Sequence, residues 1–256
     1  MNRFASLEFD DADPPSKRES PGEPVRDAPF FYRQAMLAWL GGDWELGLRN
    51  YSRALERNHA LFEAWSGQVM MLIELGEYPE AQVWADKALE LFPEHPELLA
   101  EKAIACVRDE KLTKAMAYSD NAVSKDRLTW RVWLSRAEVV MRRKGRLAEE
   151  CVHKAVTLGG GSVNVTRLEA GRVLSMHGRY AAALEYLERA VKDFPKSPLA
   201  WYELGRCQSQ LGLSQAAASL QQALYLRPDW PCAVRQMDRT LKAGLLIRVW
   251  RRLLGR

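Results

Sequence analysis

Small residues recur along this chain at an almost constant interval, and that repetition constrains the fold more than any other feature. An alanine returns late in each unit, with successive spacings of 34, 34, 33, 35 and 33 residues. The six positions are Ala54, Ala88, Ala122, Ala155, Ala190 and Ala223. A period of about 20 to 50 residues is the signature of stacked structural units rather than of one globular core.

The unit at residues 62–95 shows the internal pattern most clearly. Apolar residues with helical spacing form a stripe that extends from Trp65 to Ile73. Gly76 interrupts the stripe, and Pro79 suits the first turn of a second helix, where no backbone donor is needed. Small residues then repeat at helical spacing until Pro93 stops the pattern. The unit therefore predicts a helix, a short turn and a second helix.

The same elements return in the other units. A large residue recurs in the first helix, at Phe31, Trp65, Leu99, Trp133 and Trp201. Glycine recurs in the turn, at Gly42, Gly76, Gly145, Gly178 and Gly212. Over about residues 28–229 this combination resembles the tetratricopeptide repeat family. The resemblance implies an all-α, right-handed superhelical solenoid of about six helix-turn-helix repeats with a C-terminal capping helix. The expected boundaries are 28–61, 62–95, 96–129, 130–163, 164–197 and 198–229.

Copies three and four depart from the pattern. Glu110 replaces the turn glycine of copy three, and copy four ends in three successive glycines at residues 159–161. Ordering a run of glycines has a high entropic cost. The run predicts either a loose joint between the front and back copies or simply a longer loop.

Residues 1–27 differ from the repeats in composition. They hold four of the twelve prolines, and seven acidic residues against four basic ones. We expect a disordered acidic arm. Phe4, Leu7 and Phe9 stand beside acids, as is typical of a docking peptide, although an idle tail is the alternative. Residues 3–13 are predicted to occupy the groove of their own chain or of a second copy, and the second case would give self-association.

Two further segments follow the repeats. Residues 230–244 predict a capping helix that Gly244 ends. Residues 245–256 predict a cationic amphipathic helix. The residues expected to contact a membrane or a partner are Arg248, Trp250, Arg251 and Arg252. Such a helix suits an anionic membrane surface or a groove on a partner. A second capping helix is the alternative.

The resemblance places the working surface on the concave face, which the first helices line. An apolar front is expected from Tyr32, Met36, Trp39, Leu40, Met70 and Ile73, and a row of cations from Arg108, Arg142, Arg172 and Arg206. These arginines either receive an acidic peptide or belong to a solvated face, on which Glu169 and Glu203 pair with Arg172 and Arg206, three residues later. Some family members clamp a chaperone's terminal carboxylate, but the matching positions here hold Tyr32, Met36, Gly67, Glu97 and Glu101. That ligand is not expected.

No pattern in the sequence points to catalysis, to a cofactor or to a metal. The four histidines form no paired ligand spacing, and neither do the cysteines Cys106, Cys151, Cys207 and Cys232. The net charge of +4 is too modest to suggest nucleic acid. Without an apolar run of ~18 residues or a signal-like start, a cytoplasmic location is expected. The sequence predicts a non-enzymatic protein-protein interaction scaffold or adaptor. The alternative is a peripheral membrane organiser recruited by the C-terminal helix.

Overall fold

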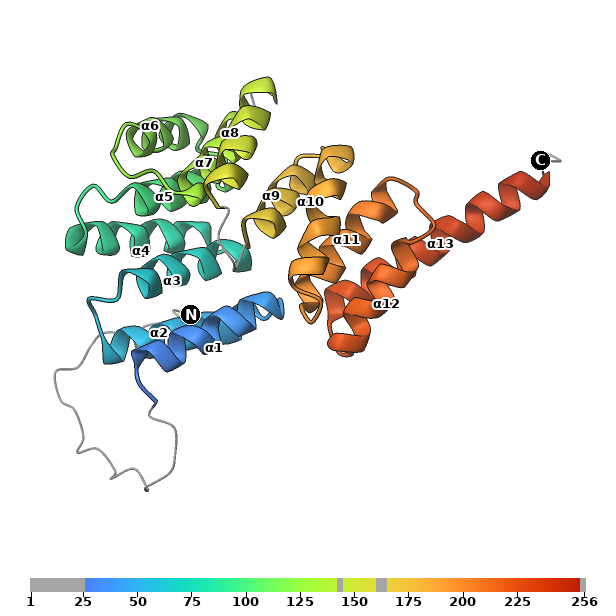
Figure 1. The fold of residues 1–256 in the computed structure, drawn as a ribbon, viewed down its shortest axis with the longest axis horizontal. Coiled ribbons are helices and arrows are strands. Elements are labelled where there is room, and N and C mark those ends of the chain that lie inside the picture. The colour runs from blue at the N-terminus through green and yellow to red at the C-terminus, as the bar shows by residue number, and fades with distance from the viewer. Residues whose placement is uncertain (1–25, 142–144, 160–164, 254–256) are drawn as a thin grey trace.

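A computed structural model describes residues 26–141, 145–159 and 165–253, although not the side chains from Gly244 onward. Thirteen helices and no strands occur in these ranges (Figure 1). The first helices of six pairs are α1 (Ala28–Leu40), α3 (Phe62–Leu75), α5 (Pro96–Arg108), α7 (Trp130–Met141), α9 (Val165–Met176) and α11 (Pro198–Gln210). Their partners are α2 (Trp44–Arg57), α4 (Tyr78–Leu91), α6 (Leu112–Val123), α8 (Gly145–Leu158), α10 (Tyr180–Asp193) and α12 (Ala216–Leu226), and α13 (Pro231–Leu253) follows. The predicted all-α repeat solenoid is confirmed. The predicted acidic arm lies almost wholly outside the described residues.

Local sequence sets the ends of the helices. The carboxylates of Asp27 and Asp43 accept hydrogen bonds from backbone amides in the first turns of α1 and α2, at 2.8 and 3.1 Å. Ser197 caps α11 in the same way. Gly76 ends α3 with a left-handed φ of 82°, which a residue without Cβ adopts at little cost. Glu110 keeps the same kind of conformation, with φ of 59°.

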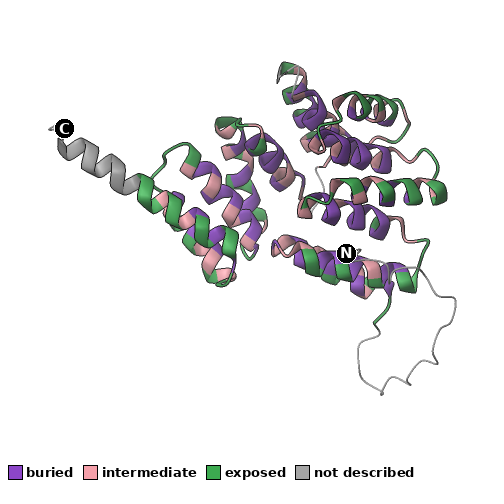
Figure 2. Ribbon diagram, turned by 180° about the vertical axis from the view of Figure 1, so that it is seen from behind, coloured by how far each residue is buried: buried purple, intermediate pink, exposed green. Residues whose placement is uncertain are grey.

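The core lies between neighbouring helices, as the buried positions in Figure 2 show. All six recurrent alanines are buried. Trp65 is only 4% exposed and packs on Trp84 of the same hairpin, with the ring centroids 5.7 Å apart. Its indole Nε1 donates to the carbonyl of His59 at 2.8 Å, and Trp201 makes the same contact six residues back with Pro195. The hairpins therefore repeat in their anchoring bonds as well as in their spacing.

The solenoid has a front unit, α1–α8, and a back unit, α9–α13 (Figure 1). It turns so far that the α1–α2 turn meets the back unit. Ser197 Oγ donates to the carbonyl of Leu40 at 2.6 Å, and Arg227 Nη1 donates to the carbonyl of Gly41 at 2.9 Å. A Cβ on Gly42 would lie 2.5 Å from the Trp230 ring, so glycine is required there. We call this contact the closure.

The last helix differs from the prediction at one point. Gly244 was expected to end a capping helix, but α13 is a single helix that continues through it to Leu253. A glycine within a helix costs only about 1 kcal/mol, which good helix formers on both sides can offset. The start of α13 packs on the solenoid, and Trp230, the residue before the helix, contacts the ring of Tyr202 with the centroids 4.7 Å apart and the ring planes at 47°. Among the described residues, no helix has the length and apolar character that crossing a bilayer requires.

Candidate functional site

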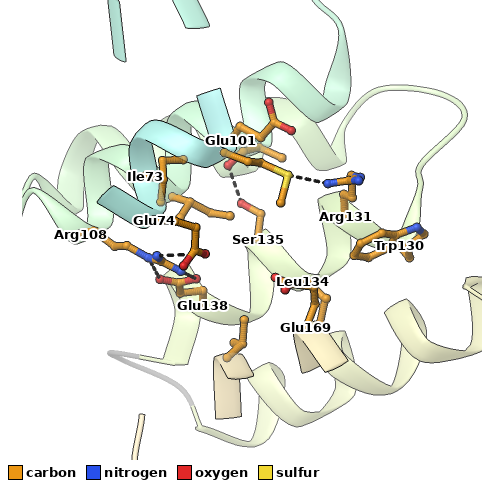
Figure 3. Close-up of a pocket in the computed structure, with 14 residues that line it drawn as sticks. Ile73, Glu74, Glu101, Arg108, Trp130, Arg131, Leu134, Ser135, Glu138 and Glu169 are labelled. Carbon is orange, nitrogen blue, oxygen red and sulfur yellow. Dashed lines mark hydrogen bonds and ion pairs between the residues drawn. The ribbon is translucent and has the colours of Figure 1, made fainter. Parts of the chain in front are cut away.

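A pocket opens on the concave face between helices α3, α5, α7 and α9 (Figure 3). It holds about 530 Å³ of space, part of which is open to solvent. Its apolar wall includes Met70, Ile104 and Leu134, and a smaller pocket that reaches α1 shares Met70 and Arg131 with it. We call the two together the concave pocket.

The structure brings together some of the predicted groove residues. Met36 and Trp39 line the smaller part of the concave pocket, and Met70, Ile73 and Arg108 line the larger part. The side chains of Trp39 and Ile73 are buried, so they form the wall of the pocket rather than an exposed patch.

Other predicted residues lie elsewhere. Tyr32 packs edge-on against the ring of Tyr51 and lines neither part of the concave pocket. Leu40 belongs to the closure. Arg142 lies outside the described residues. The predicted tail residues Arg248, Trp250, Arg251 and Arg252 lie on α13, in the part whose side chains are not described.

Arg131 and Trp130 line both parts of the concave pocket, and sequence analysis missed them. The Arg131 guanidinium lies over the Trp130 ring, 4.7 Å from its centroid, and is 3.8 Å from the Glu97 carboxylate. The described arginines of the predicted row stand late in the first helices, whereas Arg131 stands at the start of α7. The available signal was an aromatic residue followed directly by arginine.

Glu101 is a buried acid in the wall of the same pocket, with only 3% of its surface exposed. The Ser66 hydroxyl donates to Oε1. Oε2 has no hydrogen-bond partner among the residues that the structure describes. Burial raises the pKa of Glu101 to about 8, although Arg131 and the Ser66 hydrogen bond act in the opposite direction.

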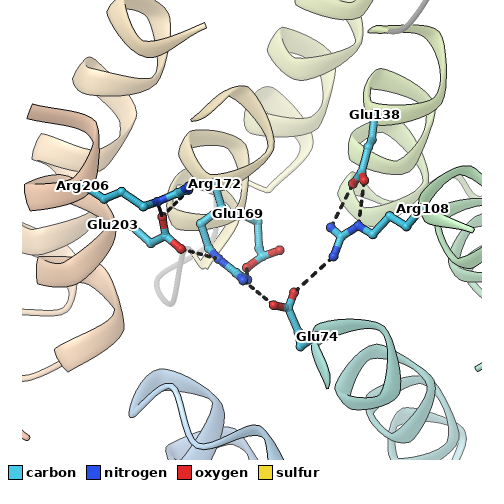
Figure 4. A network of polar contacts seen from close by, with 7 residues as sticks. All are labelled: Glu74, Arg108, Glu138, Glu169, Arg172, Glu203 and Arg206. Atoms are coloured by element: carbon cyan, nitrogen blue, oxygen red, sulfur yellow. Dashed lines mark hydrogen bonds and ion pairs between the residues drawn. The ribbon is translucent and has the colours of Figure 1, made fainter. Parts of the chain in front are cut away.

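A network of ion pairs crosses the concave face beside the pocket (Figure 4). Its centre is Arg172, which is 5% exposed. Arg172 contacts carboxylate oxygens of Glu74 at 2.5 Å, Glu169 at 2.7 Å and Glu203 at 3.4 Å. Because Glu74 belongs to α3 and Arg172 to α9, this pairing joins the front unit to the back unit.

The other two described arginines of the predicted row are paired as well. Arg108 donates two hydrogen bonds to Glu138, at 2.8 and 3.1 Å, and Arg206 lies 2.7 Å from Glu203. The predicted pairs Glu169–Arg172 and Glu203–Arg206 are therefore present, but much of the network is buried rather than solvated. The described arginines of the predicted row all contact carboxylates of the chain itself.

The pKa values of two carboxylates in the network are shifted in opposite directions. Burial alone would raise the pKa of Glu74, but the charges of Arg172 and Arg108 lower it overall. Burial and the negative charge of Glu74 raise the pKa of Glu169, despite its contact with Arg172. Among the described residues, no cluster of three or more histidine, cysteine or acidic side chains could hold a metal ion.

Comparison with known families agrees with this architecture. The family described as Tetratricopeptide repeat matches residues 32–96 and 168–231, together half of the chain. The chain belongs to this family.

Individual relatives resemble it over limited regions. "Protein SGT1 homolog" from Oryza sativa subsp. japonica is 34% identical over 84 residues, which are 33% of this chain and 23% of that protein. The chain thus spans about a quarter of this relative's length.

Solved structures share the fold at low sequence identity. The human IFIT1 dimer with m7Gppp-AAAA superposes with a TM-score of 0.56 and 16% identity, over 87% of this chain and 66% of that one. A chain of the APC/C hetero-tetramer Cut9-Hcn1 superposes with a TM-score of 0.54 and 14% identity, over 84% of this chain and 43% of that one. A tetratricopeptide repeat protein from Parabacteroides merdae superposes with a TM-score of 0.53 and 16% identity, over 86% of both chains.

Proposed function

We propose that this chain is a non-enzymatic scaffold or adaptor that holds a segment of a partner protein in the concave pocket. Stacked repeats create extended concave surfaces that repeat proteins use for binding. The observation that carries the proposal is the mixed lining of the pocket. Met70, Ile104 and Leu134 form an apolar wall. Beside it, two buried polar atoms, Glu101 Oε2 and Trp39 Nε1, have no hydrogen-bond partner in the part of the chain that the structure describes. Apolar pockets with a few convergent polar groups are the usual form of a binding site.

Differential capture tests this proposal. Met70 is half-buried in the wall of the pocket, so Met70→Glu should disturb binding there more than it disturbs folding. Val83 lies on α4, is exposed and does not line the pocket, so Val83→Glu is the matched control. We expect quantitative mass spectrometry of captured proteins to show a partner that is lost with Met70→Glu and kept with Val83→Glu. Identical sets for the two variants would contradict the assignment of the pocket.

The course of α13 favours a second candidate function, that of a peripheral membrane organiser. The helix continues to Leu253, so residues 245–253 have the helical backbone that the predicted amphipathic contact requires. The end of α13 extends away from the other helices (Figure 1). An arginine near an anionic membrane surface contributes ~1 kcal/mol to binding.

Flotation with vesicles that contain anionic lipid tests the second candidate. Replacing Arg248, Arg251 and Arg252 by glutamate should leave the protein in the soluble fraction, and raised salt should have the same effect. Membrane binding that ignores both changes would rule out the electrostatic attraction.

A further inference from the structure

The concave pocket has more negative than positive groups in its wall. The larger part is lined by four carboxylates, Glu74, Glu101, Glu138 and Glu169, and by two guanidinium groups, Arg108 and Arg131. Arg108 is bound to Glu138 through two hydrogen bonds, and Arg172 holds Glu74 and Glu169 from outside the pocket lining. Glu101 is therefore the acid of this wall that has no cation at hydrogen-bonding distance within the described ranges of the chain.

Charged and titratable groups reach Glu101 from several elements. Glu97 stands one turn earlier on α5. Arg131 on α7 and Tyr51 on α2 also interact electrostatically with Glu101. Ser66 on α3 binds Oε1 and leaves Oε2 without a partner among the described residues. A buried carboxyl in apolar surroundings is stable as an anion only when a cation or further donors reach it. A ligand that brings a cation would supply what the chain does not.

The remaining wall defines the shape of that ligand. Met70, Ile104 and Leu134 give the pocket an aliphatic lining on the way to Glu101. Lysine and arginine combine a long aliphatic stem with a charged end, so they can bury the stem while the end finds a partner. We propose that the concave pocket binds a lysine or arginine side chain of an extended partner segment, with its charge paired to Glu101. This inference rests on the proposed function of the pocket as a binding site for a partner segment.

A second unused group lies in the smaller part of the pocket. The indole Nε1 of Trp39 is buried and has no acceptor among the described residues. It can donate only, so it suits a carbonyl oxygen of the partner's backbone. The two groups together select a peptide that offers a carbonyl to Trp39 and a cation to Glu101. An acidic segment would meet the excess of carboxylates instead.

Four peptides that differ at one position test the inference. Each is an acetylated and amidated Ala-Ser-Leu-Ala-Xaa-Ala-Leu-Ser-Ala, in which Xaa is arginine, lysine, norleucine or glutamate. We expect the arginine and lysine peptides to bind about tenfold or more tightly than the norleucine peptide, and the glutamate peptide to bind weakest. Because Glu101 must lose its proton to pair with the cation, affinity should increase from about pH 6 to about pH 9. Calorimetry in two buffers near neutral pH should report the release of about one proton.

Glu101→Gln keeps the shape of the side chain and removes its charge. This variant should bind all the peptides about as weakly as norleucine and should release no proton. Glu90→Gln, an exposed residue on α4, is the matched control and should behave like the parent.

The outcomes separate the inference from the function on which it rests. Equal binding of the norleucine and arginine peptides, unchanged by Glu101→Gln, would overturn the basic specificity and leave a peptide site. Tighter binding of the glutamate peptide would overturn it in favour of an acidic partner. Binding of none of the four to folded protein would count against both proposals.

Discussion

Two kinds of contact hold the repeats together, and they differ in chemistry. Successive repeats meet through apolar packing, in which small residues allow close approach. A Cβ on Gly67 of the second repeat would lie 2.2 Å from the ring of Tyr51 in the first. The closure and the Glu74–Arg172 ion pair of the network instead join distant repeats through hydrogen bonds and charge. Arg227 donates to a backbone carbonyl, and Arg172 pairs with Glu74 across 98 residues of sequence.

This difference indicates which contacts solution conditions can change. Apolar burial responds little to salt, whereas charge pairs are screened by it, buried pairs less than exposed ones. A buried arginine that loses its carboxylates, or the reverse, also leaves an uncompensated charge. We therefore expect stacking to determine whether the chain folds, and the polar contacts to determine how far the front and back units close on each other.

The largest expected effect is in the stacking contacts. Trp65 is buried and packs on Trp84, so Trp65→Ala should lower the free energy of unfolding by ~3–5 kcal/mol through loss of buried surface and creation of a cavity. Chemical denaturation followed by circular dichroism measures the change.

Tyr225 is the control for this substitution. It is 78% exposed, so Tyr225→Ala should change the free energy of unfolding by less than about 0.5 kcal/mol. Equal effects at Trp65 and Tyr225 would show that burial between the helices is not the source of stability.

The second prediction concerns the buried acid within the stacking region. The pKa of Glu101 is raised to about 8 in the folded protein. Its contribution to stability is therefore present at low pH and is lost as the pH rises from the unfolded value, ~4.3, through about 8.

Glu101→Gln should remove this part of the pH dependence. The denaturant concentration at the unfolding midpoint of the parent should decrease as the pH rises from about 5 to about 9. The midpoint of the variant should decrease less over the same range. Parallel pH profiles would mean that Glu101 is charged and solvated in the folded protein.

The third prediction breaks the polar link between the two units. Arg172→Leu leaves Glu74, Glu169 and Glu203 without their shared cation, so that the carboxylates repel one another. We expect the free energy of unfolding to decrease by about 1.5–3 kcal/mol. Small-angle scattering should show a larger radius of gyration, because the front and back units move apart.

Arg206→Leu is the matched control for Arg172→Leu. Arg206 occupies the same place one repeat later and pairs with Glu203, within the back unit. Its loss should leave the radius of gyration unchanged. If both variants keep the parent's dimensions, then the network does not hold the units together.

The sequence predicted the features that depend on neighbouring residues. The recurrent alanines identified the helix pairs because each small residue is needed where two local helices touch. The pairs Glu169–Arg172 and Glu203–Arg206 were accessible because their partners lie one helical turn apart.

The remaining features depend on how the repeats add up. The contact of Ser197 with Leu40 spans 157 residues and exists only because small rotations between repeats accumulate into a closing turn. The same accumulation places Glu74 beside Arg172 and gives Arg131 its position in the pocket. No pattern within one repeat predicts the accumulated rotation. The extent of α13 was missed for a different reason, since Gly244 was given more weight as a helix breaker than one glycine carries.

The smallest expected effect lies in a turn, away from both kinds of contact. Glu110 has a left-handed φ of 59° at the position where Gly76 has 82° and Gly178 has 73°. This conformation strains a residue that has a Cβ, by about 1 kcal/mol. Glu110→Gly should therefore raise the free energy of unfolding by roughly 0.5 kcal/mol, because the greater freedom of glycine in the unfolded chain offsets part of the gain.

The reverse change at the equivalent position is the matched control for Glu110→Gly. A Cβ on Gly76 would meet no atom within 4 Å, so Gly76→Glu reports the backbone cost without a steric clash. It should lower the free energy of unfolding by about 1 kcal/mol. Both variants should leave the radius of gyration and its salt dependence unchanged, because neither residue takes part in the closure or in the ion-pair network. A stabilising Gly76→Glu or a destabilising Glu110→Gly would show that side-chain contacts, not backbone conformation, decide the residue at this turn.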